Sequence, residues 1–167
     1  MKLDNLKAKS TVFIDANIFI YHFTGASDES SFFLSQCESG VYNGTTSANV
    51  ILEVLHRLMM VEAVHKRLIH PPNLVNKLKK HPEKIKQLHD YFTNTQKIEQ
   101  MGIIIRPVSA MTILKSQIHR SRYGLMVNDS IIVTIMEEEG VAYLATHDKN
   151  FNSVADIKVL SPQDIDL

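Results

Sequence analysis

The sequence predicts an α/β fold with three layers, α/β/α, in which helices cover both faces of a central parallel sheet of four to five strands. Short runs rich in β-branched residues alternate along the chain with longer helical segments, which is typical of β-α-β units. The strand runs are largely apolar, as expected for strands buried on both faces. A Lys-rich stretch at about 62–100 is expected to form a helical insertion.

Five short segments are expected to be the strands. β-branched and aromatic residues fill 11–14 (TVFI), and isoleucine fills most of 103–106 (IIIR). The other strands are predicted at 41–46, 141–146 and 157–160. The second of the five contains Asn43 and Gly44, residue types that are uncommon inside strands.

Helices are expected between these strands. Ser47 is a suitable N-cap, and Gly40 and Gly140 are suitable stops. Two proline breaks, Pro71-Pro72 and His81-Pro82, divide the insertion. The predicted helices cover 29–39, 48–64, 73–80, 83–100, 109–121 and 128–139.

Length and composition restrict the class of protein. A chain of 167 residues with 44% apolar and 22% charged residues is expected to form a single domain, 1–167. Lys plus Arg and Asp plus Glu both number 18, so net charge does not indicate the partner. The lone Cys37 excludes an internal disulfide and favours a cytoplasmic location. We expect no signal peptide and no membrane span.

The most informative residues are four carboxylates in apolar surroundings. Asp15 lies inside VFIDANIFI, Glu53 inside VILEVL, and Asp129 inside LMVNDSIIV. Asp148 closely follows the apolar run VAYLA. An isolated buried carboxylate is costly, so such residues need a partner or a metal ion.

The predicted positions of these acids converge. Asp15 and Asp148 follow strands, and ligand sites of open parallel sheets lie outside the carboxyl ends of the strands. Asp129 is expected at a helix N-terminus, and Glu53 about two turns into the helix after the second strand. Carboxylates without thiols form a hard-oxygen site, which suits Mg²⁺ or Mn²⁺.

Each acid also has a structural alternative. Asp129 fits a helix cap, Glu53 fits an i,i+4 pair with Arg57, and Asp148 fits a turn residue in THDKN. Asp15 has no evident local partner. All the alternatives would have to hold at once, which favours a shared site.

The order and context of these segments resemble the PIN-domain nucleases, in particular the toxin-type, VapC-like members. VFIDANIFI is similar to that family's first strand and its Asp, and TTSANVILEVLHRL to the segment that carries its Glu. VNDSIIVTIMEEEGVAYLATHDKNF resembles the third block, with an Asp at a helix start and Thr-x-Asp after the next strand. The resemblance covers about residues 11–160.

The resemblance implies a PIN-like fold and metal-dependent hydrolysis of RNA. Asp15, Glu53, Asp129 and Asp148 match the acidic positions that bind metal and act in catalysis. Supporting roles fall to Asn17, Thr146 and Asn150, the last standing where many members have a further acid. Mg²⁺ or Mn²⁺ would activate water and neutralise charge on the phosphate. An antitoxin partner is also implied.

Lysines in the insertion are candidates for RNA binding, because an acidic centre needs basic surface nearby to hold a polyanion. An ordinary solvated helix is the alternative. His147, beside Asp148, is a candidate substrate contact. We also expect a homodimer, because the helix around Leu55, Leu58, Met59 and Met60 carries much apolar surface. The candidate RNA-binding lysines are Lys77, Lys79, Lys80 and Lys84.

Other functions remain open at this stage. The leading hypothesis is an endoribonuclease, either a toxin or an RNA-processing enzyme, with one or two metal ions. The alternative is a nucleic-acid-binding module with little catalysis. A phosphatase with Asp15 as nucleophile is disfavoured, because Asn17 stands where a second Asp is expected and no phosphate-binding glycine loop follows.

Overall fold

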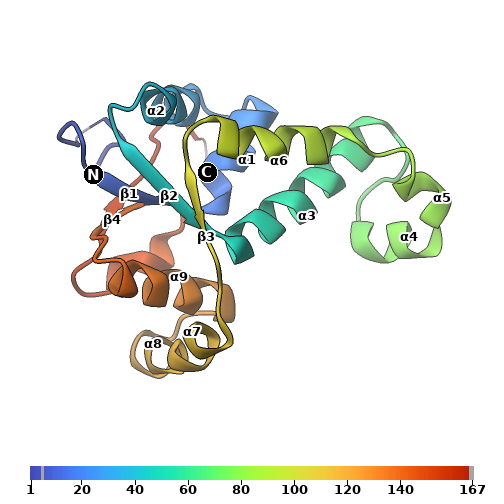
Figure 1. The fold of residues 1–167 in the computed structure, drawn as a ribbon. Helices are drawn as coiled ribbons and strands as arrows, with labels where there is room; N and C mark the ends of the chain where they lie inside the picture. The colour runs from blue at the N-terminus through green and yellow to red at the C-terminus, as the bar shows by residue number, and fades with distance from the viewer. Residues whose placement is uncertain (5, 166–167) are drawn as a thin grey trace.

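A five-stranded parallel sheet forms the centre of the molecule (Figure 1), in the order β3-β2-β1-β4-β5. The computed structural model describes residues 1–4 and 6–165. The α/β fold with a central parallel sheet is therefore confirmed. The strands are β1 (Thr11–Ile14), β2 (Asn43–Ser47), β3 (Ile104–Arg106), β4 (Tyr143–Ala145) and β5 (Lys158–Leu160).

β1 occupies the middle of the sheet between β2 and β4. Val12, Phe13 and Ile14 are fully buried, which explains why this strand is apolar on both faces. Gly44 in β2 is needed for packing, because a Cβ there would lie 3.0 Å from Ile103 and 3.1 Å from Ile14. The glycine that seemed unfavourable in a strand thus permits close contact between neighbours.

Helices lie on both sides of the sheet (Figure 1). One side carries α1 (Ala16–Thr24), α2 (Asp28–Glu38) and α6 (Asp90–Gln100). The other carries α7 (Ala110–Lys115), α8 (Gln117–Tyr123) and α9 (Val127–Glu138). Their apolar faces and the strands share one core cluster.

Three helical predictions need correction. α1 was not expected, because its sequence ANIFIYHFT is rich in β-branched and aromatic residues and carries no clear helical period. The segment predicted at 83–100 is two helices, the short α5 (Pro82–Ile85) and α6. The segment predicted at 109–121 is also two helices, α7 and α8, which meet at Ser116.

The insertion forms an arm that extends from the sheet (Figure 1). α3 (Ala48–His65) leaves the carboxyl end of β2, and α6 returns beside it. α4 (Leu74–Lys80) and α5 lie at the far end. A separate apolar cluster of Ala63, Ile69, Leu78 and Leu88 holds this end together.

Glu62 joins the two long helices of the arm. Its carboxylate accepts hydrogen bonds from Lys66 Nζ (2.6 Å) and from the backbone N–H groups of His89 (2.9 Å) and Tyr91 (2.8 Å). Burial alone would raise the pKa of Glu62, but these hydrogen bonds outweigh it and lower the pKa to about 2. A charge on α3 therefore caps the start of α6.

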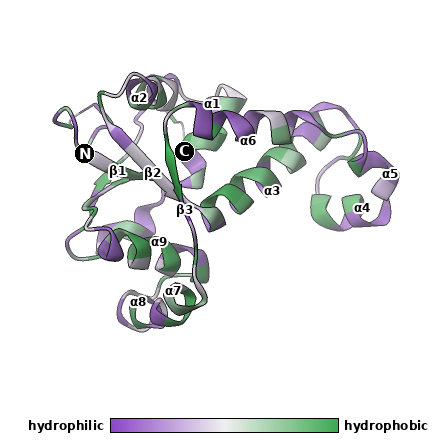
Figure 2. Cartoon of the chain, viewed as in Figure 1, coloured by the Kyte–Doolittle hydropathy of each residue, from purple (hydrophilic) through white to green (hydrophobic). Residues whose placement is uncertain are grey.

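Hydrophobic residues make up most of β3 and of the beginning of α3, whereas α5 is mainly hydrophilic (Figure 2). Among the described residues, no helix combines the length and the apolar character required to cross a bilayer.

Candidate active site

Asp15 lies between β1 and α1, where it caps the helix. It is 7% exposed. Its Oδ1 accepts a 2.7 Å bond from Ala16 N–H, and its Oδ2 accepts 2.6 Å bonds from Asn17 Nδ2 and from the Thr146 hydroxyl. The expectation that Asp15 has no local partner was therefore wrong. Because α1 was not anticipated, its capping interaction was missed.

Thr146 and Asn17 join the ends of β1 and β4. The Thr146 hydroxyl also accepts hydrogen bonds from Asn17 Nδ2 (2.9 Å) and from Asp148 N–H (3.0 Å). Asn17 Oδ1 in turn accepts from His147 N–H (3.0 Å). These side chains fix the orientation of Asp15 before any ligand binds.

Asp148 is the half-buried N-cap of a short 3₁₀ helix, η1 (Lys149–Ser153). Its Oδ1 accepts from Asn150 N–H (2.8 Å), and Asn150 Nδ2 lies 3.5 Å from its Oδ2. The turn role foreseen as an alternative is real, and the charge of Asp148 nevertheless raises the pKa of Asp129.

Asp129 occupies the first turn of α9. The N-cap position is Met126, and the helix begins at Val127. Asp129 is half-buried, and the backbone N–H of Met126 favours its charge. The capping role considered from the sequence is therefore partly present, but burial and the neighbouring carboxylates outweigh it in the pKa of Asp129.

Glu53 is half-buried on α3. In the part of the chain that the structure describes, no ion pair within 4.0 Å joins it to Arg57. The i,i+4 pair considered from the sequence is thus not formed, and the Glu53 charge instead acts on Asp15 and Asp129.

The four acids act on one another electrostatically. Burial raises the pKa of Asp15 to about 6 against the lowering effect of Thr146 and Ala16, and the charges of Glu53 and Asp129 raise it further. Burial, followed by the charges of Asp148 and Glu53, raises the pKa of Asp129 to about 6. Each of the four carboxylates thus acts on at least one other, and all of them contribute to one region of negative charge.

This region suits a divalent cation by its donor chemistry. Its ligands are carboxylate oxygens, the type preferred by Mg²⁺ and Mn²⁺, and their mutual repulsion is what a cation would relieve. Within the described ranges, no three His, Cys, Asp or Glu side chains are already arranged as a metal cluster. Binding would therefore draw the carboxylates closer together.

Arg120 supports the helix that carries Asp129. Its Nη1 donates to Ser116 Oγ (2.7 Å), where α7 meets α8, and to Ser130 Oγ (2.8 Å) in the first turn of α9. Ser130 Oγ donates to Val127 O (2.7 Å). The sequence did not reveal this role, because nothing in its local pattern links Arg120 to a serine ten residues away.

The four candidate lysines lie at the end of the arm, on α4 and at α5 (Figure 1). Lys77 Nζ donates to His70 O (2.7 Å), and Lys84 Nζ donates to Leu68 O (2.8 Å). These two fasten the arm's own backbone. Lys79 and Lys80 are exposed and have no side-chain hydrogen bond among the described residues, so they are the better candidates for contacting a ligand.

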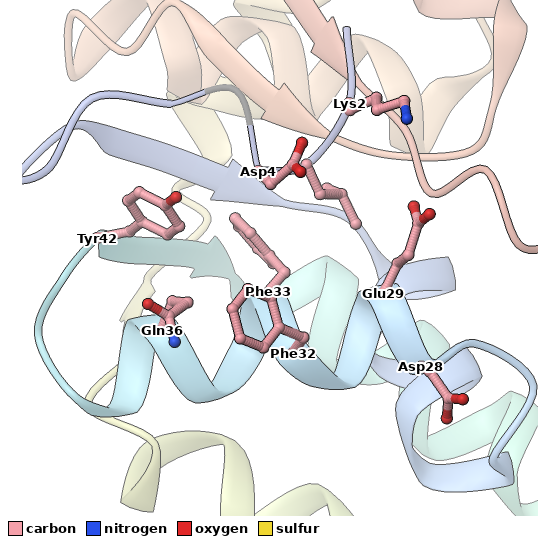
Figure 3. A pocket seen from close by; sticks show the side chains of 9 residues that line it. Lys2, Asp4, Asp28, Glu29, Phe32, Phe33, Gln36 and Tyr42 are labelled. Atoms are coloured by element: carbon pink, nitrogen blue, oxygen red, sulfur yellow. The ribbon is translucent and has the colours of Figure 1, made fainter.

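A cavity of about 310 Å³ lies at the opposite edge of the sheet (Figure 3). Residues that precede β1 and β2, among them Asp4 and Tyr42, line it together with α2. Phe33 and Tyr42 stack there with ring centroids 5.8 Å apart. None of the four acids contributes, so this cavity is separate from the candidate site.

The strand order places the acids at a topological switch point, because the chain continues from β1 to β2 and β3 on one side and to β4 and β5 on the other. Fold and site thus define an α/β protein with a group of acidic residues near the carboxyl edge of its sheet. The chain belongs to the PIN-domain family, which matches residues 12–157. No curated protein matches the sequence.

Solved structures share this fold at low sequence identity. VapBC2 from Rickettsia felis, bound to a DNA fragment from its promoter, has a TM-score of 0.56 and 16% identity, covering 92% of this chain and 99% of that one. VapC20 of Mycobacterium tuberculosis, a toxin that cleaves the sarcin-ricin loop, has a TM-score of 0.58 and 12% identity, covering 86% of this chain and 95% of that one. A toxin-antitoxin complex from Klebsiella pneumoniae has a TM-score of 0.54 and 20% identity, covering 88% of this chain and 95% of that one.

Proposed function

We propose that this protein is a metal-dependent endoribonuclease, formed by one nuclease domain, that hydrolyses RNA phosphodiester bonds. One observation carries the proposal. Asp15 and Asp129, from separate elements, both have pKa values raised to about 6, chiefly by burial and further by neighbouring carboxylates. Such repulsion destabilises the fold without a ligand, whereas a bound cation would relieve it.

Asp15, Glu53, Asp129 and Asp148 would hold Mg²⁺ or Mn²⁺. When bound, the ion would activate a water molecule and neutralise charge on the phosphate. Asn17 and Thr146 fix the Asp15 carboxylate, and Arg120 fixes the first turn of α9 beneath Asp129. Asn150 holds Asp148 at the start of η1. Asp129, Glu53 and Asp148 are half-exposed, as access to a polymer requires.

The substrate proposal rests on family and charge. The solved relatives include a toxin that cleaves the sarcin-ricin loop, which supports RNA as the substrate. Lys79 and Lys80 at the end of the arm would add electrostatic attraction for phosphates, and Lys77 and Lys84 add positive charge while they fasten the arm.

The proposal includes a toxin role, a cytoplasmic location and an antitoxin partner. Two solved relatives are toxin-antitoxin assemblies, which supports the partner. An RNA-processing role is the alternative within the same chemistry. An upstream gene for a small protein that inhibits cleavage would favour the toxin role.

A homodimer also remains part of the proposal. On α3, Leu58 is buried and Met59 and Met60 are partly buried on the arm's apolar cluster, whereas Leu52 (67%) and Val61 (43%) are exposed. Exposed apolar side chains also gather on α7, α8 and the turn before α9, where exposure reaches 60–72% at Met111, Leu114, Ile118 and Met126. Light scattering at micromolar concentration that gives 19.0 kDa would refute the dimer.

A module that binds nucleic acid with little catalysis is the second candidate, and Asn150 in place of a further acid favours it. Incubating the purified protein with a mixed RNA pool decides between the two. The proposed enzyme cuts RNA in the presence of Mg²⁺ or Mn²⁺ and does not cut it in excess EDTA. Undiminished cleavage in EDTA would contradict the metal mechanism, and RNA binding without cleavage would favour the module.

A further inference from the structure

A second cavity, of about 350 Å³, opens at the carboxyl edge of the sheet beside β4 and β5. η1 forms one wall, and the segment after β5 forms another. We call it the β5-side pocket. The side chains that matter here are those of Thr146, His147, Asp148, Asn152, Ser161 and Gln163.

The β5-side pocket adjoins the candidate acids. Asp148 lines it, and Thr146 in its wall donates to Asp15. The strand order places this pocket on the β5 side of the acids, while the arm follows β2 on their other side. A chain that crosses the acids from the arm would therefore next reach the pocket.

Several polar groups of the pocket have spare hydrogen-bonding capacity. Gln163 Nε2 donates to Ser161 O (3.0 Å), which leaves its Oε1 as an acceptor. His147 uses Nδ1 toward Ser161 Oγ (3.2 Å), which leaves Nε2. Within the described residues, the Asn152 side-chain amide has no hydrogen bond.

A cation adds to this set. Lys149 lines the same cavity, is exposed, and makes no ion pair within residues 1–4 and 6–165. The pocket thus combines amide donors and acceptors, the His147 imidazole, the Lys149 ammonium and the Asp148 carboxylate. A base edge requires paired donors and acceptors, an unstacked base requires a ring to lie against, and a phosphate requires a cation.

We infer that the β5-side pocket binds one nucleotide of the RNA strand next to the bond that is cut. Asn152 and Gln163 hydrogen-bond to the base edge, the His147 ring lies against the base, and Lys149 contacts the adjoining phosphate. The pocket therefore sets which nucleotide is accepted at that position. The position of this nucleotide beside a cleaved bond rests on the proposed function, whereas the binding of a nucleotide in the pocket does not.

The binding test uses full-length protein that carries Asp129→Asn, so that RNA is not cut during titration. Asn152→Ala/Gln163→Ala in this background is compared with Gln36→Ala, an amide on α2 at the opposite edge of the sheet. The probes are single-stranded nine-nucleotide RNAs of each base, followed by fluorescence anisotropy and by the side-chain amide signals of Asn152 and Gln163 in NMR.

We expect the double variant to bind at least one of these RNAs about tenfold more weakly, as two lost hydrogen bonds predict, while Gln36→Ala binds like its parent. The Asn152 and Gln163 signals should shift on addition of RNA. If the double variant and its parent bind each of the four RNAs with equal affinity, or if the Asn152 and Gln163 signals do not shift, the pocket assignment is overturned.

Cleavage mapping separates this inference from the proposed function. With Asp129 restored, the double variant should cut a mixed pool with a changed nucleotide preference at one position beside the cut. If wild type cuts no RNA but the pocket signals still shift, the proposed enzyme fails and the nucleotide site stands. If wild type cuts and the double variant keeps the same preference, the enzyme stands and the pocket assignment is wrong.

Discussion

The Thr146 hydroxyl donates a 2.6 Å hydrogen bond to Asp15 Oδ2 and so joins two residues that lie 131 positions apart in the sequence. The bond lowers the pKa of Asp15 against the effect of burial. It links the ends of β1 and β4 at the point where the sheet order reverses. The position and the charge of Asp15 both depend on it.

Thr146→Val keeps the side-chain shape and removes this donor. A hydrogen bond to a charged group contributes about 1.5–3 kcal/mol, so Mn²⁺ affinity should fall at least tenfold. Thr146→Ser retains the hydroxyl and should bind Mn²⁺ nearly as wild type does. Calorimetric titration with Mn²⁺ checks both, and equal affinities for all three proteins would show that Thr146 does not prepare Asp15.

The pH dependence of stability follows from the raised pKa values of about 6 for Asp15 and Asp129. Between pH of about 4 and about 6 the folded protein holds protons that the unfolded chain has released, so stability falls as pH rises through this window. Asp15 alone contributes a slope of up to about 1.4 kcal/mol per pH unit.

Glu53→Gln should reduce the stability lost between pH 4.5 and pH 7, because the charge of Glu53 raises both pKa values. Urea unfolding in EDTA at pH 4.5 and pH 7 measures the loss of stability for each protein. Glu99→Gln, an exposed acid on α6, is the matched control and should behave as wild type does. If Glu53→Gln and Glu99→Gln lose the same stability, Glu53 does not act on Asp15 and Asp129.

Arg120→Met should weaken catalysis without unfolding the protein. The first turn of α9 would lose its tie to α8, and a displacement of about 1 Å at a reacting group can cost up to about 100-fold in rate. Arg120→Lys should recover part of the rate. Arg122→Met, on the same helix and over the Tyr123 ring, is the control. Cleavage rate and Mn²⁺ affinity are both measured per folded molecule. A defect in folding alone would leave both values unchanged.

Lys79→Ser/Lys80→Ser should reduce the salt dependence of RNA binding. Lys77 and Lys84 are left in place because they hold the arm's backbone. If both lysines contact phosphates of a single strand, the slope of log K against log salt should flatten by about 1.4. The exposed pair Lys7→Ser/Lys158→Ser is the control of equal charge. An unchanged slope would mean that the arm does not contact RNA.

The sequence predicted the strands to within about two residues, because short β-branched runs ending at polar residues are characteristic of buried parallel strands. It did not predict α1, whose β-branched and aromatic residues also suit a strand. The division of 83–100 into two helices depends on Glu62, which caps α6 from another helix. A local pattern cannot reveal such a contact.

The candidate site also has one part that the sequence predicted and another part that it did not. The four acids could be proposed from the sequence because a carboxylate in apolar surroundings is unusual. Their supports could not be derived from it, since Thr146 reaches Asp15 and Arg120 reaches Ser130 only through the packing of distant elements. Asn17 and Thr146 were anticipated only by family resemblance.

Thermal unfolding of wild type and Asp129→Asn, each in EDTA and in Mn²⁺, tests the central claim most directly. Burial and the charges of Asp148 and Glu53 disfavour the charge of Asp129, whereas the Met126 N–H and the α9 dipole, the latter worth about 0.3–1 kcal/mol, favour it. Because its pKa is raised, repulsion and burial exceed that gain, so the variant should be as stable as wild type or more stable in EDTA. Mn²⁺ should raise its unfolding temperature less than that of wild type, because one ligand is lost. A variant that is clearly less stable in EDTA yet gains as much from Mn²⁺ would show that Asp129 supports the fold and does not bind the metal.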